Sequence, residues 1–170
     1  MLIGNGDGTF QQAVTYRTGS RPVAVSLVSL TGNGVLDLVT ANNAGDSVSV
    51  LPGNGDGTFQ SRVDYAAGSG PTGLQAVDIN GDRIQDLVVS NGGGNDVSVL
   101  LGSGDGTFQG PLHFAAGDNP AAVAVGDFNT DGWNDLAVAN SGSNDVSALL
   151  NAADWPTGPR TGRHPRNSRL

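Results

Sequence analysis

The stretch GNGDGTF at residues 4–10 decides the fold, because it returns unchanged at 53–59 and as GSGDGTF at 102–108. Apolar segments such as SVSVL precede the phrase, and strand-like runs such as FQSRVDY follow it. Short alternating apolar runs around a cluster of Gly, Asn and Asp are typical of a β-hairpin. A phosphate-binding P-loop would need a lysine and a following helix, and the phrase has neither signal. It therefore predicts a tight turn in which the aspartate has a structural role.

The phrase belongs to a strict repeat with a period of 49 residues and no insertions. Several positions in register carry the same residue or a related one: Phe10, Phe59 and Phe108; Tyr16, Tyr65 and Phe114; Pro22, Pro71 and Pro120; Asn42, Asn91 and Asn140. A period of about 40–50 residues with several short strands is typical of β-propeller blades. In the second unit the expected strands are 71–77, 87–91, 96–102 and 108–117. One blade cannot bury both faces alone, so neighbouring blades must supply its core.

We therefore predict an all-β fold of about three four-stranded antiparallel blades in a partial, open β-propeller. The repeats occupy residues 1–151, and the expected segments are the end of an earlier blade at 1–19 and units at about 20–68, 69–117 and 118–151. Residues 152–170 form an irregular Arg/Pro-rich tail, because NAADWPT stands at 151–157 where the hairpin phrase is due. Propellers close with about 4–8 blades. Further blades in a parent chain, or self-association through open edge strands, are therefore expected.

The composition fits this class and excludes others. All 16 acidic residues are Asp, all 8 basic residues are Arg, and the formal net charge is −8. Such acidity argues against nucleic-acid binding and favours cations. No Cys is present, which excludes disulfides and thiolate metal sites. No apolar run is long enough for a membrane span. No signal peptide begins the chain, and Met1 stands almost directly before a repeat turn, so we expect part of a longer exported protein.

An Asp-rich loop between the first two strands of a unit carries the candidate chemistry. In the third unit it reads DFNTDGWND, with oxygen side chains at positions 1, 3, 5 and 9 and a backbone carbonyl at position 7. The predicted ligands are Asp127, Asn129, Asp131, Trp133 (through its carbonyl) and Asp135. Oxygen donors in this number suit Ca²⁺, and Gly132 at position 6 permits the sharp turn. Three carboxylates this close would repel one another without a cation.

The other two loops depart from this pattern in graded fashion. In the second, the predicted ligands are Asp78, Asn80, Asp82, Ile84 (through its carbonyl) and Asp86. Arg83 replaces the glycine at position 6, which places a strained backbone and a cation beside the site. The first loop, SLTGNGVLD, has one carboxylate, so we expect a weak or empty site. Its corresponding residues are Ser29, Thr31, Asn33 and Asp37. The structural alternative is that Asp and Asn merely form turns. Two nearly complete loops at the same position of the repeat favour Ca²⁺ binding instead.

The hairpin phrase together with DxNxDGxxD at a fixed phase resembles the FG-GAP/VCBS repeat family, the blades of integrin-α-like propellers, over about residues 2–151. The resemblance implies Ca²⁺ in the loop between the first two strands of a blade. It also implies a secreted or cell-surface protein of adhesion or ligand binding, often within a longer chain. The first loop and the blade number depart from the family pattern.

The leading hypothesis is a non-enzymatic, calcium-binding interaction module, with a protein or carbohydrate ligand left open. The alternatives are part of a propeller-type polysaccharide lyase or glycosidase, and a lectin. The only histidines are His113 and His164, and no catalytic Ser/His/Asp set can be built convincingly from the sequence. Paired Asp residues for glycoside hydrolysis stay possible. Only two Trp are present and neither repeats, so the sequence does not decide on a lectin.

Overall fold

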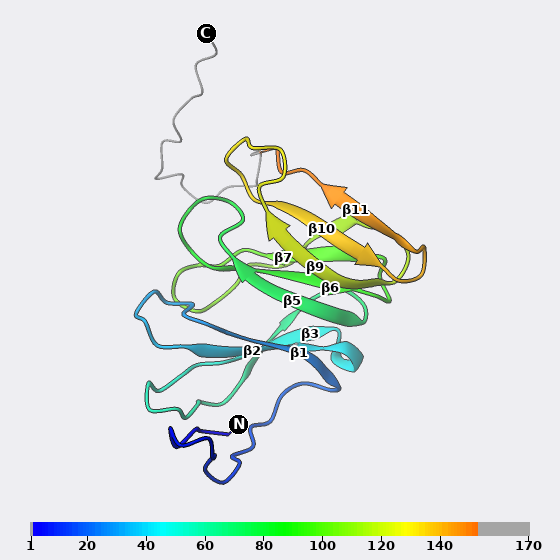
Figure 1. Cartoon of the computed structure of the whole chain (residues 1–170). Helices are drawn as coiled ribbons and strands as arrows, with labels where there is room; N and C mark the ends of the chain where they lie inside the picture. The colour runs from blue at the N-terminus through cyan, green and yellow to red at the C-terminus, as the bar shows by residue number, and fades with distance from the viewer. Residues whose placement is uncertain (1, 153–170) are drawn as a thin grey trace.

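A computed structural model describes residues 2–152 of the chain, so the expected tail lies outside it except for Ala152. The described part is all-β, and its only helical element is the short 3-10 turn η1 (Asn43–Gly45). The strands form three antiparallel sheets of four, four and three strands, in agreement with the predicted open arc of propeller blades. Figure 1 shows the sheets stacked in chain order, from the N-terminal sheet at the bottom to β11 at the top.

Each sheet is a simple meander in which consecutive strands pair. The first sheet holds β1 (Pro22–Val28), β2 (Asp37–Asn42), β3 (Ser47–Leu51) and β4 (Val63–Ala66). The second holds β5 (Pro71–Val77), β6 (Asp86–Asn91), β7 (Asp96–Leu100) and β8 (Leu112–Ala115). The third holds β9 (Pro120–Gly126), β10 (Asp135–Asn140) and β11 (Asp145–Leu149). The repeated proline begins the first strand of every sheet, where its missing N–H costs no ladder bond.

The third sheet has one strand fewer than its neighbours among the described residues. Shifting β8 by the 49-residue period places a fourth strand at 161–164, outside the described part. The sequence there is TGRH, whereas β8 has LHFA and β4 has VDYA. The expected fourth strand of the third unit thus loses its apolar alternation together with the hairpin phrase.

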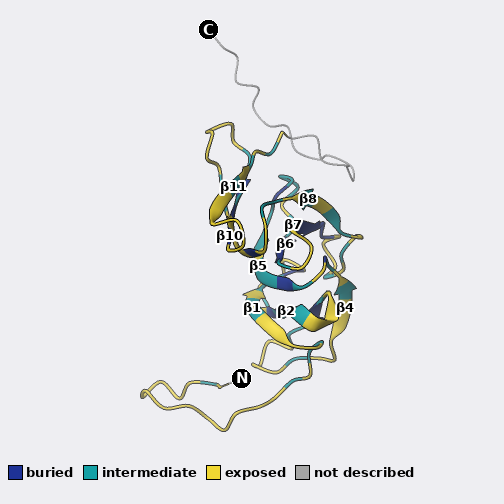
Figure 2. Ribbon diagram, turned by 90° about the vertical axis from the view of Figure 1, so that its right-hand side faces the viewer, coloured by how far each residue is buried: buried dark blue, intermediate teal, exposed yellow. Residues whose placement is uncertain are grey.

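Two apolar layers hold the stack together, one on each side of the middle sheet. We call the face of a sheet that points to the following sheet its forward face, and the opposite one its rear face. On β6, Leu87 and Val89 pack rearward against the first sheet, while Val88 packs forward against the third. This alternation is the period of two that a strand buried on both faces requires. Figure 2 shows buried residues gathered in the middle sheet, with exposed residues along the outlying strands β1, β4 and β11.

Two repeated positions noted in the sequence have clear packing roles. Tyr65 on β4 meets Phe108 of the next hairpin edge-to-face at 5.4 Å between ring centroids, and Tyr16 meets Phe59 in the same way at 5.4 Å. Each of these pairs joins a residue of one unit to the hairpin of the next unit. Asn91, buried at the end of β6, donates through Nδ2 to Asp96 Oδ1 at 2.7 Å and to Ser98 Oγ at 2.8 Å. It thereby closes the turn that leads into β7.

Candidate metal-binding loops

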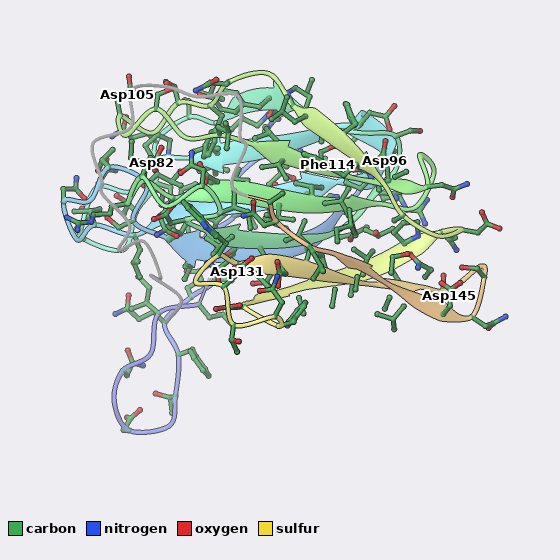
Figure 3. The ribbon with its side chains drawn as sticks, turned by 90° about the horizontal axis from the view of Figure 1, so that it is seen from above. Asp82, Asp96, Asp105, Phe114, Asp131 and Asp145 are labelled. Atoms are coloured by element: carbon green, nitrogen blue, oxygen red, sulfur yellow. The ribbon has the colours of Figure 1, made fainter. Side chains whose placement is uncertain are left out.

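The three candidate loops lie at the same end of the strands, where each loop joins the first strand of its sheet to the second. Figure 3 shows Asp82 of the second loop and Asp105 of a hairpin at the same end of the sheets, and Asp96 and Asp145 at the opposite end. The hairpin phrases and the candidate ligands therefore share an end, as expected for consecutive antiparallel strands.

The hairpin aspartates have the structural role that the sequence predicts. Asp56 Oδ1 accepts hydrogen bonds from Thr58 N at 2.9 Å and from Thr58 Oγ1 at 2.6 Å. The Thr58 hydroxyl, followed by the backbone N–H, holds the pKa of Asp56 below its usual value. Asp7 and Asp105 make the same bonds to Thr9 and Thr107. The phrase is a tight Asx-type turn in all three copies.

The second loop folds around the carboxylate of Asp78. Its Oδ1 accepts from Gly81 N at 2.7 Å and from Asp82 N at 3.1 Å, and its Oδ2 accepts from Arg83 N at 2.8 Å. Asn80 then faces Asp82, because Asn80 Nδ2 donates to Asp82 Oδ2 at 3.0 Å. The backbone of loop two thus wraps around the position 1 carboxylate, and the side chains at positions 3 and 5 are bonded to each other.

The third loop repeats this arrangement with the same partners in register. Asp127 Oδ2 accepts from Gly132 N at 2.9 Å, and Asn129 Nδ2 donates to Asp131 Oδ2 at 2.9 Å. Asp131 Oδ1 accepts from Trp133 N at 2.9 Å, just as Asp82 Oδ1 accepts from the N–H at position 7 of its own loop. The third loop is more exposed than the second, since no sheet follows it among the described residues.

The first loop keeps the same turn with neutral acceptors. Ser29 Oγ accepts from Gly34 N at 3.1 Å, in the place where Asp78 and Asp127 accept from position 6. Asn33 Oδ1 accepts from Val35 N at 2.8 Å, and Thr31 is exposed. Backbone geometry alone therefore does not require the carboxylates at positions 1 and 5 of the other two loops.

The aspartate at position 9 differs from the rest, because both of its oxygens are bonded to backbone N–H groups of other segments. Asp86 Oδ2 accepts from Ile79 N at 3.0 Å, and Asp86 Oδ1 accepts from Gly102 N at 2.8 Å. The equivalent pairs are Leu30 N and Gly53 N on Asp37, and Phe128 N and Asn151 N on Asp135. These carboxylates clamp the loop start to the chain that follows the third strand. The residue spacing alone predicts these aspartates only as ligands, and the retention of Asp37 in the first loop is the sequence signal of their second role.

The three clamps differ in electrostatic environment. Burial raises the pKa of Asp86 to about 6, the N–H groups of Gly102 and Ile79 oppose the rise, and the charges of Asp82 and Asp78 add to it. The hydrogen bond from Asn151 N instead lowers the pKa of Asp135. The middle sheet is covered on both faces, whereas the third has no neighbour beyond it among the described residues, so burial outweighs the hydrogen bonds at Asp86 but not at Asp135.

Two loop residues hold backbone conformations that favour glycine. Arg83 has a φ of +70°, where the other loops have Gly34 and Gly132, so the expected strain at position 6 is present. Thr130 has a φ of +61° at position 4, where the other loops have Gly32 and Gly81. A left-handed conformation costs a non-glycine residue roughly 1–2 kcal/mol. Loops two and three therefore carry one strained residue each, and the strain at Thr130 was missed in the sequence.

The donor set fits Ca²⁺ in kind. Among residues 2–152, no three acidic or histidine side chains lie close enough together to hold a metal ion by themselves. A cation in loop two would therefore also need the amide oxygen of Asn80 and the carbonyl of Ile84 beside its carboxylates. Mixed carboxylate, amide and carbonyl oxygens are the ligands that Ca²⁺ takes. The charges of Asp78 and Asp82 already act on Asp86, which a cation between them would relieve.

Comparison with known protein families identifies the repeat. The FG-GAP-like repeat matches residues 29–89 and matches again at residues 78–138, together well over half of the chain. The chain belongs to the FG-GAP-like repeat family. The two matches begin at Ser29 and Asp78, the first positions of loops one and two, and are offset by the 49-residue period. A search of curated proteins found no match. Within residues 2–152, no helix is long and apolar enough to cross a membrane.

Proposed function

We propose that this FG-GAP-like repeat chain is a non-enzymatic, calcium-binding interaction module of an exported protein used in adhesion or ligand binding. One observation carries the proposal: loops two and three arrange their Asp and Asn side chains with the same hydrogen bonds at the same phase of the repeat. Loop one keeps the same turn without these charges, so turn formation does not account for them.

Calcium would be held in loop two by Asp78, Asn80, Asp82, the carbonyl of Ile84 and Asp86. In loop three the holders would be Asp127, Asn129, Asp131, the carbonyl of Trp133 and Asp135. The ion supplies positive charge that offsets the repulsion between the carboxylates. The chain's own contribution is to hold positions 1, 3 and 5 together through N–H groups of the loop. Extracellular modules of this kind bind with dissociation constants of about 10⁻⁴–10⁻³ M.

The two candidate sites should differ in affinity. Loop three has glycine at position 6 but strained Thr130 at position 4, while loop two has glycine at position 4 but Arg83 at position 6. The backbone strains are similar in kind, but loop two also carries the positive charge of Arg83, which repels a cation. Loop three is therefore the stronger proposed site, as the sequence suggests, and loop one stays weak or empty.

A catalytic alternative rests on one cluster of side chains, and its geometry argues against it. His113 Nδ1 lies 3.2 Å from Ser98 Oγ and 3.3 Å from Asp96 Oδ2. A Ser–His–Asp relay needs the serine and the carboxylate on different ring nitrogens, whereas both share Nδ1 here. Ser98 is also fully buried, so a substrate cannot reach its hydroxyl. These observations favour an interaction module over a serine hydrolase.

Calorimetric titration with Ca²⁺ tests the proposal. We expect binding heat for the intact chain, loss of the tighter component in Asp131→Ala, loss of the weaker one in Asp82→Ala, and no change in the matched variant Asn33→Ala. At ten times the dissociation constant, free Ca²⁺ adds roughly 1.4 kcal/mol to stability, so the melting temperature should rise. No heat of binding and equal melting temperatures in chelator and in millimolar Ca²⁺ would contradict it. Glycan-array binding of the chain would favour the lectin alternative.

A further inference from the structure

The rear face of the first sheet is apolar and exposed. Val25 is 67% exposed and Leu27 is 54% exposed. Their equivalents on β9, Val123 and Val125, pack against the middle sheet, and Val123 is only 6% exposed. A groove of about 760 Å³ lies on this face, lined by Tyr16, Val23, Val25, Leu27 and Leu38 among others. The first sheet thus presents the surface that every later sheet buries.

The forward face of the third sheet is the complementary surface. Val146 on β11 is 67% exposed, whereas its equivalent Val97 is fully buried between the second and third sheets. Leu150 and Phe128 are exposed in the same way, and their equivalents Leu101 and Ile79 belong to that buried layer. An interface between the forward face of one sheet and the rear face of the next is formed twice within the chain. Its two halves are left over at opposite ends of the stack, as Figure 1 shows for the N-terminal sheet and β11.

The segment before the first sheet carries a fourth-strand sequence without a sheet of its own. Residues 14–17 are in register with β4 and β8, yet residues 11–17 belong to no strand. Tyr16 meets Phe59 as Tyr65 of β4 meets Phe108. Gly19 N donates to Ser49 Oγ at 3.0 Å, which anchors the segment to the first sheet. The segment therefore occupies the place of the fourth strand of a preceding blade, whose first three strands are not supplied by residues 2–21.

The third sheet has three strands but no fourth strand among the described residues. Its strand β11 is an edge strand that pairs only with β10 there. In the first two sheets the third strand pairs with a fourth in one register, for example Val48 with Tyr65 and Ser49 with Asp64. The same register would place Tyr16 opposite Val146 and Thr15 opposite Ser147. It would also place Arg17 opposite Asp145, which is a pair of opposite charges.

We propose that the third sheet of a second copy of this chain docks on the rear face of the first sheet of the first copy. Residues 14–17 of the first copy then pair with β11 of the second copy and complete its third sheet as the fourth strand. The contact is made twice in a closed ring of two copies, so two hybrid blades form, each from β9, β10 and β11 of one copy and the N-terminal segment of the other. The two exposed apolar faces are covered by the packing that the chain already uses between its own sheets. Two copies supply six sheets, within the range of about 4–8 in which propellers close.

Light scattering during size-exclusion chromatography tests the association, in chelator and in Ca²⁺ alike, since the proposal does not depend on the metal. We expect a mass twice the chain mass of 17.1 kDa. Val25→Asp should give the single-chain mass with an unchanged β-sheet circular dichroism spectrum. Ser61→Asp adds the same charge at an exposed position outside both faces and should stay dimeric. A single-chain mass for the unaltered protein across a dilution series would overturn the proposal, and so would a dimer that Val25→Asp leaves intact.

Cross-linking tests the strand register without relying on a destabilising change. The natural chain has no cysteine, so Thr15→Cys and Ser147→Cys each carry a single thiol. Mixing the two variants under oxidising conditions should give a covalent heterodimer. Gln12→Cys, three residues away on the same segment, should give far less product with Ser147→Cys. Equal yields from Thr15→Cys and Gln12→Cys, or no product from either, would overturn the proposed pairing. The absence of product is the result expected if the chain's own tail, or further repeats of a longer chain, covered β11 instead.

Discussion

Replacement of Asp37 by asparagine separates the clamp role of the position-9 aspartate from metal binding. Asp37 is buried, and its two oxygens accept from Leu30 N at 3.0 Å and Gly53 N at 2.9 Å. The side-chain amide of the variant keeps one acceptor and turns an NH₂ group toward the other N–H. Each hydrogen bond to a charged group contributes about 1.5–3 kcal/mol, and an unsatisfied buried donor costs about 1–3 kcal/mol. Asp37→Asn should therefore destabilise the chain by roughly 2–3 kcal/mol.

Urea denaturation in chelator measures this loss. With a slope of about 1–3 kcal/mol per molar urea, the midpoint should fall by roughly 1–2 M at unchanged slope. Asp56→Asn is the matched control, because Asp56 is exposed and an asparagine can still accept from Thr58 N; its effect should stay within about 0.5 kcal/mol. Calcium binding should be the same in Asp37→Asn and in the unaltered chain. Unchanged stability would refute the clamp, and loss of a calcium site would refute the assignment of loop one as weak or empty.

Three further changes probe the other features of the loops. Arg83→Gly removes the backbone strain at a φ of +70° and also removes a positive charge. It should therefore stabilise the chain by about 0.5–1 kcal/mol and tighten Ca²⁺ binding at loop two, as measured by calorimetry. Weaker binding would contradict the strain argument. Because burial raises the pKa of Asp86 to about 6 from 3.8, its contribution to stability is full below 3.8 and is lost as the pH rises through 6. The stability of the unaltered chain minus that of Asp86→Asn, in chelator, should therefore fall by roughly 2–2.5 kcal/mol between about pH 4 and about pH 7, and a rise would show the sign to be wrong. Gly102→Ala places a Cβ in steric clash with the backbone oxygen of Gln85 and should destabilise the chain in thermal melts, whereas Gly110→Ala, with nothing within 4 Å, should not.

The strands and loops could be predicted because their signals are local. The expected strand at 71–77 coincides with β5, since alternating apolar residues between a proline and an Asp-rich turn fix both its ends. The turn role of Asp56 follows from Thr58 two residues later. The clamp could not be derived in this way, because Asp86 reaches Gly102, whose position depends on the pairing of β6 with β7. The strain at Thr130 was missed because only the comparison of three folded loops shows that position 4 lies at positive φ.

The two internal interfaces of the stack have a consequence for how such a chain can change in length. Leu87 and Val89 meet the first sheet, and Leu136 and Val138 meet the second from the equivalent positions. Because the units share one period without insertions, an in-frame duplication or deletion of 49 codons would create only a junction that already exists elsewhere in the protein. Unequal recombination can therefore lengthen or shorten the array without evolving a new core, and the number of units is free to drift until a ring closes.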